Sequence, residues 1–288
     1  MTHASKALRV ITAANPSPLT GPGTNTFLLG RDRIAVIDPG PDLPEHRAAI
    51  REAAAGGRIT HIFVTHAHLD HSGGAAALAH DTGAPILGFG PPEAGRSPLM
   101  QRLALEGGLN GGEGLDRSFQ PDILLRDGDS VEEREWTLTA LHTPGHFAGH
   151  LSFRWDDVIF CGDVVMGWSS TLISPPDGDL GDYFRSLSRL GAESPARLLP
   201  AHGDPIEAPA TRLAELATHR RERTAQILAA LRDAPADAAA LAARIYDIPP
   251  QLLPAATRNV LAHLIAMAEL GVVTPAAALS ATTVFSTS

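Results

Sequence analysis

The ten residues 62–71, Ile-Phe-Val-Thr-His-Ala-His-Leu-Asp-His, decide the fold. The first four are apolar or β-branched, which is typical of a buried β-strand. Four side chains that can bind a metal follow directly: His66, His68, Asp70 and His71. On an extended segment, side chains two residues apart point the same way, so His66 and His68 can share one point in space. Because α/β proteins commonly build their sites at the carboxyl ends of strands, this stretch predicts a metal site at a sheet edge.

Three more potential ligands follow apolar runs farther along the chain. They are His146, Asp163 and His202, and each stands next to a glycine. Glycine has no Cβ and therefore lets the backbone approach a neighbouring group closely. Taken alone, each of the three would be an ordinary turn residue. Together with residues 66–71 they form a set of imidazoles and carboxylates that suits two nearby cations.

Composition narrows the class of protein. The chain has 288 residues, of which 44% are hydrophobic, so most of it is not disordered and about two domains are expected. The net charge of −9 disfavours broad electrostatic binding to nucleic acid. Cys161 is the one cysteine, which excludes an internal disulfide and a cysteine-rich zinc cluster. No apolar run approaches the ~18 residues of a membrane span, so we expect a soluble, cytoplasmic protein with no membrane partner.

The first two hundred residues alternate short apolar runs with helical segments. This pattern predicts an α/β fold with two sheets and helices on their outer faces. We expect strands at 8–13, 26–29, 33–37, 62–65, 85–89, 136–141, 151–155, 158–161 and 198–200, and helices at 43–55, 73–82 and 183–190. Residues 91–121 are rich in glycine and are expected to form a long loop, either a lid or a flexible insertion.

The composition shifts to alanine, leucine and arginine after Pro205. Helices are expected at 211–232, 236–245 and 254–270, with a short β element at 272–273, which together suggest a small winged-helix-like domain. The cluster His219–Arg223 is expected on the solvated face of the first of these helices, with contact to a nucleic-acid backbone as the alternative. We therefore expect domains over 1–207 and 208–275, followed by a flexible tail over 276–288.

The order of these motifs resembles that of the metallo-β-lactamase-fold hydrolases. His66-x-His68-x-Asp70-His71 matches the signature of that family, and His146, Asp163 and His202 match its later motifs. The resemblance covers about residues 7–205 and implies an αββα sandwich with a dinuclear metal site. It also implies the ligand sets: His66, His68 and His146 for the first metal, Asp70, His71 and His202 for the second, and Asp163 as the bridge.

Some segments are similar to a narrower group, the lactamase-like endoribonucleases that carry a winged-helix-like extension. These segments are 15–18, 23–29, 37–40 and, in the extension, 255–264. Two other segments depart from that group. Residues 147–150, Phe-Ala-Gly-His, are closer to the pattern of thioester hydrolases, and residues 167–170, Gly-Trp-Ser-Ser, replace a small polar segment.

These observations predict a dinuclear-metal hydrolase that acts on a small ester, thioester or lactone. Asp70 is the expected catalytic residue, since its carboxylate can orient the attacking water and return the proton to the leaving group. Two divalent ions are expected, with zinc first and iron or manganese as alternatives. The open alternatives are a metal-dependent endoribonuclease on single-stranded RNA, an iron-dependent oxygenase on the same fold, and a binding module with a structural metal.

Overall fold

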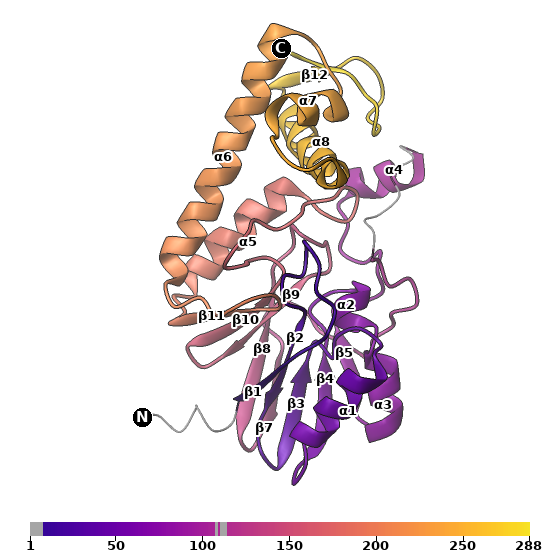
Figure 1. Ribbon diagram of the computed structural model, residues 1–288, viewed down its shortest axis with the longest axis vertical. Coiled ribbons are helices and arrows are strands. Elements are labelled where there is room, and N and C mark those ends of the chain that lie inside the picture. The colour runs from indigo at the N-terminus through magenta and orange to yellow at the C-terminus, as the bar shows by residue number, and fades with distance from the viewer. Residues whose placement is uncertain (1–7, 107–108, 110–113) are drawn as a thin grey trace.

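The computed structural model describes residues 8–106, 109 and 114–288, and two main sheets form its centre (Figure 1). The first sheet has the strand order β1 (Leu8–Thr12), β2 (Asn25–Leu29), β3 (Arg33–Ile37), β4 (Arg58–Phe63), β5 (Ile86–Gly88) and β6 (Ile123–Leu124). Strands β1 to β3 are antiparallel, whereas β3 to β6 run parallel. Parallel strands end at the same edge, and this edge carries functional side chains.

The second sheet has the order β11 (Arg197–Pro200), β10 (Val158–Gly162), β9 (Leu151–Trp155), β8 (Trp136–His142) and β7 (Ser130–Glu133). Only the pair β10 and β11 is parallel. Strand β7 was not predicted, because its sequence Ser-Val-Glu-Glu lies at the sheet edge and is only half-buried. An edge strand of this kind lacks a hydrophobic face that would mark it in the sequence.

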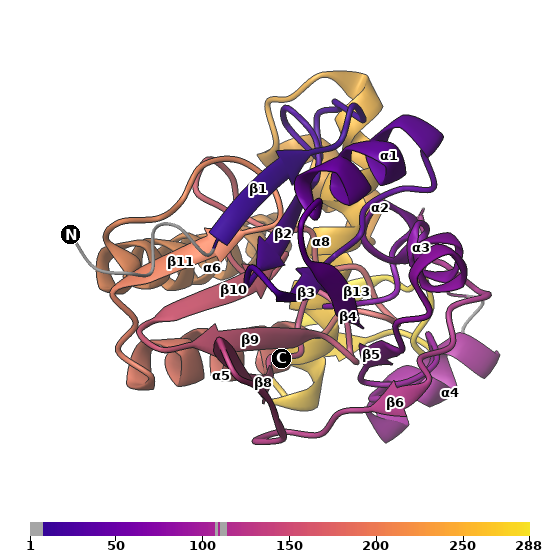
Figure 2. The same ribbon diagram turned by 90° about the horizontal axis from the view of Figure 1, so that it is seen from below.

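Alternating side chains set the layers of this domain. Phe27 and Leu29 of β2 pack between the two sheets, whereas Leu28 packs on the outer side. Helices α1 (Pro44–Ala53) and α3 (Ala75–Thr82) cover the outer face of the first sheet. Helix α5 (Leu180–Ala192) covers the second sheet (Figure 2). The expected αββα sandwich is confirmed.

A second core belongs to the C-terminal part of the chain. Helix α6 (Pro209–Asp233) runs away from the end of β11 to the C-terminal elements (Figure 1), which are α7 (Ala238–Ile245), the 3₁₀ turn η2 (Pro250–Leu252), α8 (Leu253–Glu269), β12 (Val273–Pro275) and β13 (Phe285–Thr287). The far end of α6 packs with α7 and α8 through Ile227 and Leu231. The three predicted helices are present.

The expected flexible tail over 276–288 is wrong. Its last residues form β13, which pairs antiparallel with β12 in a two-stranded sheet. Phe285 is fully buried in the C-terminal core and exchanges two backbone hydrogen bonds with Ala236. The tail therefore completes the small domain.

The expected loop over 91–121 contains a helix. Helix α4 (Pro98–Glu106) places Met100 and Leu103 against the C-terminal core, and Leu109 joins them. Helix α4, which comes from the N-terminal part of the chain, therefore packs against the C-terminal domain. Residues 107–108 and 110–113, which include four of the glycines behind the prediction, lie outside the described residues.

Arg220 corrects the expectation of a solvated basic cluster. Its side chain is only 1% exposed, and its guanidinium lies over the ring of Tyr183 at 5.5 Å from the centroid. Arg221 and Glu222 do face solvent. Only part of the cluster 219–223 is therefore a surface.

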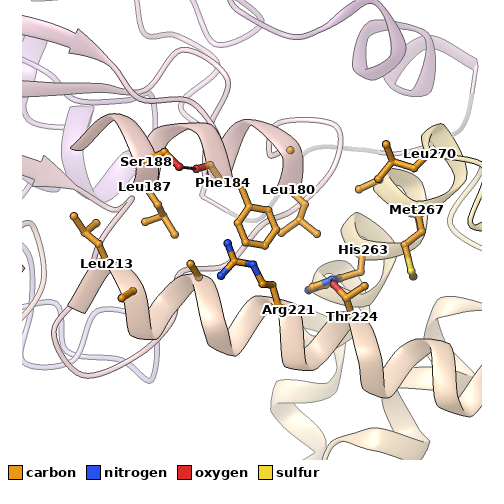
Figure 3. A pocket seen from close by; sticks show the side chains of 14 residues that line it. Leu180, Phe184, Leu187, Ser188, Leu213, Arg221, Thr224, His263, Met267 and Leu270 are labelled. Carbon is orange, nitrogen blue, oxygen red and sulfur yellow. Dashed lines mark hydrogen bonds between the residues drawn. The ribbon is translucent and has the colours of Figure 1, made fainter. Parts of the chain in front are cut away.

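A groove of about 690 Å³ lies where α5, α6 and α8 meet (Figure 3). Its lining is mostly apolar and includes Leu187 of α5, Leu213 of α6 and Met267 of α8.

Among the helices of the described ranges, none is both long and apolar enough to cross a bilayer.

Candidate metal centre

The parallel strands β3 and β4 of the first sheet place two segments next to each other, and these segments carry aspartate and histidine side chains. Asp38 follows β3 directly, and Thr65 and His66 follow β4 at the neighbouring position. The short helix α2 (Leu69–Ser72) begins after His68 and carries Asp70 and His71. The carboxyl edge of this sheet therefore gathers the first half of the predicted set, as expected for an α/β site.

The second sheet contributes the other half in the same way. Asp163 follows β10, and His202 comes two residues after the parallel strand β11, while His146 lies in the turn between β8 and β9. Gly162 allows this close approach, because a Cβ there would lie 2.4 Å from His150 Nε2. Its φ of +49° also favours glycine.

Three neutral nitrogen atoms converge in a first group. His66 Nε2 lies 2.8 Å from His68 Nδ1, and His146 Nε2 lies 3.2 Å from the same atom. Burial, reinforced by the neighbouring histidines, holds the pKa of His66 well below its usual value and lowers that of His68 to about 3. Neutral imidazole is the form that binds a metal, so this group is ready for a cation.

A second group combines histidines with carboxylates. Asp70 Oδ2 lies 3.5 Å from His71 Nε2 and 3.4 Å from His202 Nε2. Asp163 Oδ1 lies 3.5 Å from His71 Nε2 and 3.3 Å from His202 Nε2. The structure thus brings all seven predicted residues together, in overlapping groups that could each hold a metal ion.

Nearby carboxylates raise the pKa values of the two histidines in the second group, His71 and His202. Burial alone would lower the pKa of His202, but Asp163 and Asp70 outweigh it and raise the pKa to about 10. The same balance raises the pKa of His71 above its usual value, with Asp70, Asp163 and Asp38 as the opposing charges. Without a cation, protons on the two imidazoles offset the carboxylates.

In four of the five histidines, a hydrogen-bond partner at Nδ1 holds the ring in its orientation. That atom lies near Thr65 Oγ1 in His66, Asp38 Oδ2 in His71, the Leu172 carbonyl in His146 and the Gly23 carbonyl in His202. Each ring then presents Nε2 to the centre. His68 is the exception and presents Nδ1 to His66 and His146. Such supporting hydrogen bonds fix the tautomer of a metal-binding imidazole.

Asp38 is a supporting residue that the sequence reasoning did not single out. Its carboxylate is 1% exposed and accepts hydrogen bonds from the Thr65 amide and hydroxyl and from His71 Nδ1, at 2.8, 2.8 and 3.0 Å. The available signal was an acidic residue that ends an apolar run and lies close to a glycine, Gly40, much as Asp163 lies next to Gly162.

His150 supports the loop that carries Asp163. The ring is fully buried, and its Nε2 accepts a hydrogen bond from the Asp163 amide at 3.2 Å. Its proton is therefore on Nδ1, which donates to Thr143 Oγ1 at 3.0 Å. His150 therefore helps to hold the loop that carries Asp163 in place.

Two unsatisfied atoms test whether the donor set fits a metal. His71 Nε2 and Asp163 Oδ1 are both buried, and neither has a hydrogen-bond partner among the described residues. Buried polar atoms without partners are rare and costly. A cation between them would satisfy both, and the imidazole and carboxylate donors suit zinc, iron or manganese.

Comparison with known proteins decides the family. Residues 19–202 match the family model described as "Metallo-beta-lactamase superfamily". The chain belongs to the metallo-beta-lactamase superfamily. Residues 238–278 match the "Beta-lactamase associated winged helix domain", so the small C-terminal domain is a winged helix. As a superfamily member the protein is a metal-dependent hydrolase.

Relatives of this metallo-beta-lactamase superfamily protein agree with the assignment. It is 30% identical to "Beta-lactamase-like protein 2 homolog" of Caenorhabditis elegans, over 80% of this chain and 72% of the relative. It is 32% identical to "Atrochrysone carboxyl ACP thioesterase" of Aspergillus chevalieri, over 79% of this chain and 66% of the relative. A metallo-beta-lactamase family protein from Thermus thermophilus superposes with a TM-score of 0.79 at 26% identity, over 98% and 99% of the two chains.

The pocket above the metal groups has walls from both parts of this superfamily member. It has a volume of about 370 Å³, and its lining includes His68, Asp70, His146, Asp163 and His202. Leu19 and Trp168 also line it, together with residues of the winged helix that include Tyr246, Ile248 and Leu252. Among the described residues of the lining, none is lysine or arginine.

Proposed function

We propose that the protein is a two-metal hydrolase that cleaves a small thioester, ester or lactone with an apolar acyl part. The position of Asp163 carries the proposal. Its Oδ2 lies 3.7 Å from His146 Nε2 in the first group, and its Oδ1 lies 3.3 Å from His202 Nε2 in the second. A carboxylate that faces both groups supports a shared ligand between two cations.

In this proposal the seven residues divide into two ligand sets joined by Asp163. His66, His68 and His146 would hold one ion, and Asp70, His71 and His202 the other. Zinc is the expected metal, because imidazole dominates the first set. Two bound ions would lower the pKa of a shared water toward ~7 and stabilise negative charge on the substrate oxygen.

Asp70 is the proposed catalytic residue. Its side chain is 28% exposed, faces the pocket, and accepts a hydrogen bond from Thr24 Oγ1 at 3.3 Å. The carboxylate would orient the attacking water and take its proton. In a thioester, the water oxygen bonds to the carbonyl carbon, the C–S bond breaks, and Asp70 passes the proton to the departing sulfur.

The pocket walls favour an acyl substrate over RNA. Tyr246, Ile248 and Leu252 offer an apolar surface to the acyl part, whereas no lysine or arginine of the described lining is placed to contact phosphates. Proteins that bind nucleic acid rely on such cations. A relative named as a thioesterase agrees with this choice of substrate class.

Metal analysis and a substrate panel test the proposal. The panel holds acetyl and decanoyl thioesters of N-acetylcysteamine, a lactone, bis(p-nitrophenyl) phosphate and single-stranded RNA. We expect two metal ions per chain and preferred hydrolysis of the thioesters. RNA cleavage as the main activity, with a steep loss of rate in salt, would instead support the ribonuclease alternative. One iron per chain with oxygen consumption would support the oxygenase.

A further inference from the structure

The segment Thr171–Ile173 orients His146 although it has no regular secondary structure. His146 Nδ1 lies 2.6 Å from the Leu172 carbonyl and 3.0 Å from Thr171 Oγ1. Because a carbonyl can only accept, the His146 proton is on Nδ1, and the lone pair of Nε2 faces His68 and Asp163. Whatever fixes Leu172 therefore also fixes the direction of that lone pair.

Two residues of the C-terminal helices hold this segment on either side of Leu172. Asn259 on α8 accepts a hydrogen bond from the Ile173 amide at 3.0 Å through its Oδ1. Arg220 on α6 donates through Nη2 to the Thr171 carbonyl, and through Nη1 to the same Asn259 Oδ1 at 3.1 Å. The loop that supports a candidate ligand is thus anchored by α6 and α8, two of the helices that follow the metallo-beta-lactamase domain.

Arg220 is an unusual anchor. Its side chain is 1% exposed and forms no salt bridge within the described residues. A buried cation without a carboxylate is costly unless its hydrogen bonds compensate. The bonds that Arg220 makes go to Thr171 and Asn259, so its burial serves the segment beside His146.

We propose that Arg220 and Asn259 are positioning residues of the metal centre. They fix Thr171 and Ile173, the Leu172 carbonyl between them holds the Nδ1–H of His146, and the first metal group keeps its geometry. The winged helix therefore acts on the metal centre itself, in addition to lining the substrate pocket. The inference rests on the proposed function in one respect, namely that His146 binds a metal.

Metal affinity and the tautomer of His146 test the inference without any substrate. Asn259→Leu keeps the branching at Cγ but removes the acceptor, whereas Asn259→Asp is isosteric and keeps it. Ile265→Val, a change in the buried face of α8 that does not contact Thr171–Ile173, is the control for loss of stability. Each full-length protein is titrated with Zn²⁺ and Co²⁺ against a chelator, and imidazole ¹⁵N shifts are recorded for the metal-free form.

We expect Asn259→Leu to weaken Zn²⁺ binding at the site of His66, His68 and His146 about 10- to 100-fold, the range found when partners of metal ligands are removed. The Co²⁺ absorption of that site should change, and His146 should populate the Nε2–H tautomer. Asn259→Asp should restore affinity to within a few-fold of the parent, and Ile265→Val should leave it unchanged. If Asn259→Leu does not fold, Asn259→Ser, whose side chain is too short to reach Ile173, carries the same test.

The inference is overturned if the Asn259 variant that folds keeps the parent's affinity and tautomer, or if Ile265→Val loses as much affinity. If the parent protein binds Zn²⁺ but hydrolyses no thioester, that result would count against the proposed function and leave this inference intact. Arg220→Met should reproduce the effect of Asn259→Leu, since it removes the bond to Thr171. An unchanged Zn²⁺ affinity in a folded Arg220→Met would likewise contradict the role of Arg220.

Discussion

Histidines of the two groups carry different charges, and metal binding should reveal the difference. The pKa of His202 is raised to about 10 and that of His71 is also raised, so both hold a proton at neutral pH in the metal-free protein. His68, with a pKa lowered to about 3, is neutral there. A metal must displace the protons of the second group but none from His68.

We therefore predict that the second metal ion releases one to two protons at pH 7 and that the first releases almost none. Calorimetric titration with Zn²⁺ in buffers of different ionisation enthalpy counts the protons. Affinity of the second site should rise with pH, about tenfold per unit for each proton, and level off only near pH 10. Affinity of the first site should vary much less around neutral pH, because burial lowers the pKa of its histidines. Equal release at both sites would contradict the assignment of charges.

Asp70→Asn should abolish turnover, because the amide cannot accept the proton that the attacking water loses. We expect kcat to fall at least about 10³-fold on the best thioester of the panel, within the usual range for a general acid–base residue. Circular dichroism should show an unchanged fold. Full activity in this variant would remove Asp70 from the mechanism.

Asp38→Asn should weaken metal binding. The carboxylate oxygen of Asp38 accepts a hydrogen bond from His71 Nδ1–H, whereas the NH₂ group of the new amide would face that N–H with a second donor. The expected loss of Zn²⁺ affinity is about 10- to 100-fold. Asp116→Asn is the matched control, because Asp116 is also buried but accepts its bonds from Ser72 and Ser118. Equal losses in both variants would show that buried charge, rather than the bond to His71, is what matters.

The seven candidate ligands could be predicted because they follow apolar runs that are visible in the sequence and because their order matches the metallo-β-lactamase signature. Asp38 and Arg220 show where this reasoning stops. The role of Asp38 depends on the pairing of β3 with β4, which joins residues with no local relation in the chain. Arg220 sits in a run of charges typical of a solvated face, and its burial arises only when Tyr183 and Asn259 pack around it.

Among the elements, the regular helices were predicted well, and so were the inner strands except β4, which spans Arg58–Phe63 instead of the expected 62–65. The polar residues Arg58, Thr60 and His61 hid its first half. The other exceptions are short. Strand β13 has three residues, too few to show a hydrophobic period. Helix α4 lies in a glycine-rich stretch whose composition suggested a loop. In both cases contacts with the distant C-terminal core stabilise the element.

Phe285→Ala tests the contribution of β13. The ring is fully buried, so we expect the free energy of unfolding to fall by about 3–5 kcal/mol, as is usual when a buried aromatic side chain is removed. Urea denaturation measures the change. Ser286→Ala, at the half-buried neighbouring position, is the control and should cost little.

At the scale of the whole molecule, residues of the winged helix line the pocket that also contains the candidate metal ligands, which is the proposed substrate pocket. We predict that Leu252→Asp raises KM for a decanoyl thioester about tenfold, because a charge replaces an apolar contact, while KM for the acetyl thioester stays within about twofold. Leu270→Asp, on the exposed end of α8, is the control. Equal effects on both substrates would mean that the acyl chain does not reach this wall.

The pairing of β13 with β12 also links the stability of the small domain to the candidate site. Phe285 is buried in the core to which α7 and α8 contribute. A change that loosened this core would therefore disturb the winged-helix residues that line the pocket and, through Asn259, the segment beside His146. Substitutions at Phe285 should thus be felt at the candidate ligands, although none of them is near it in the sequence.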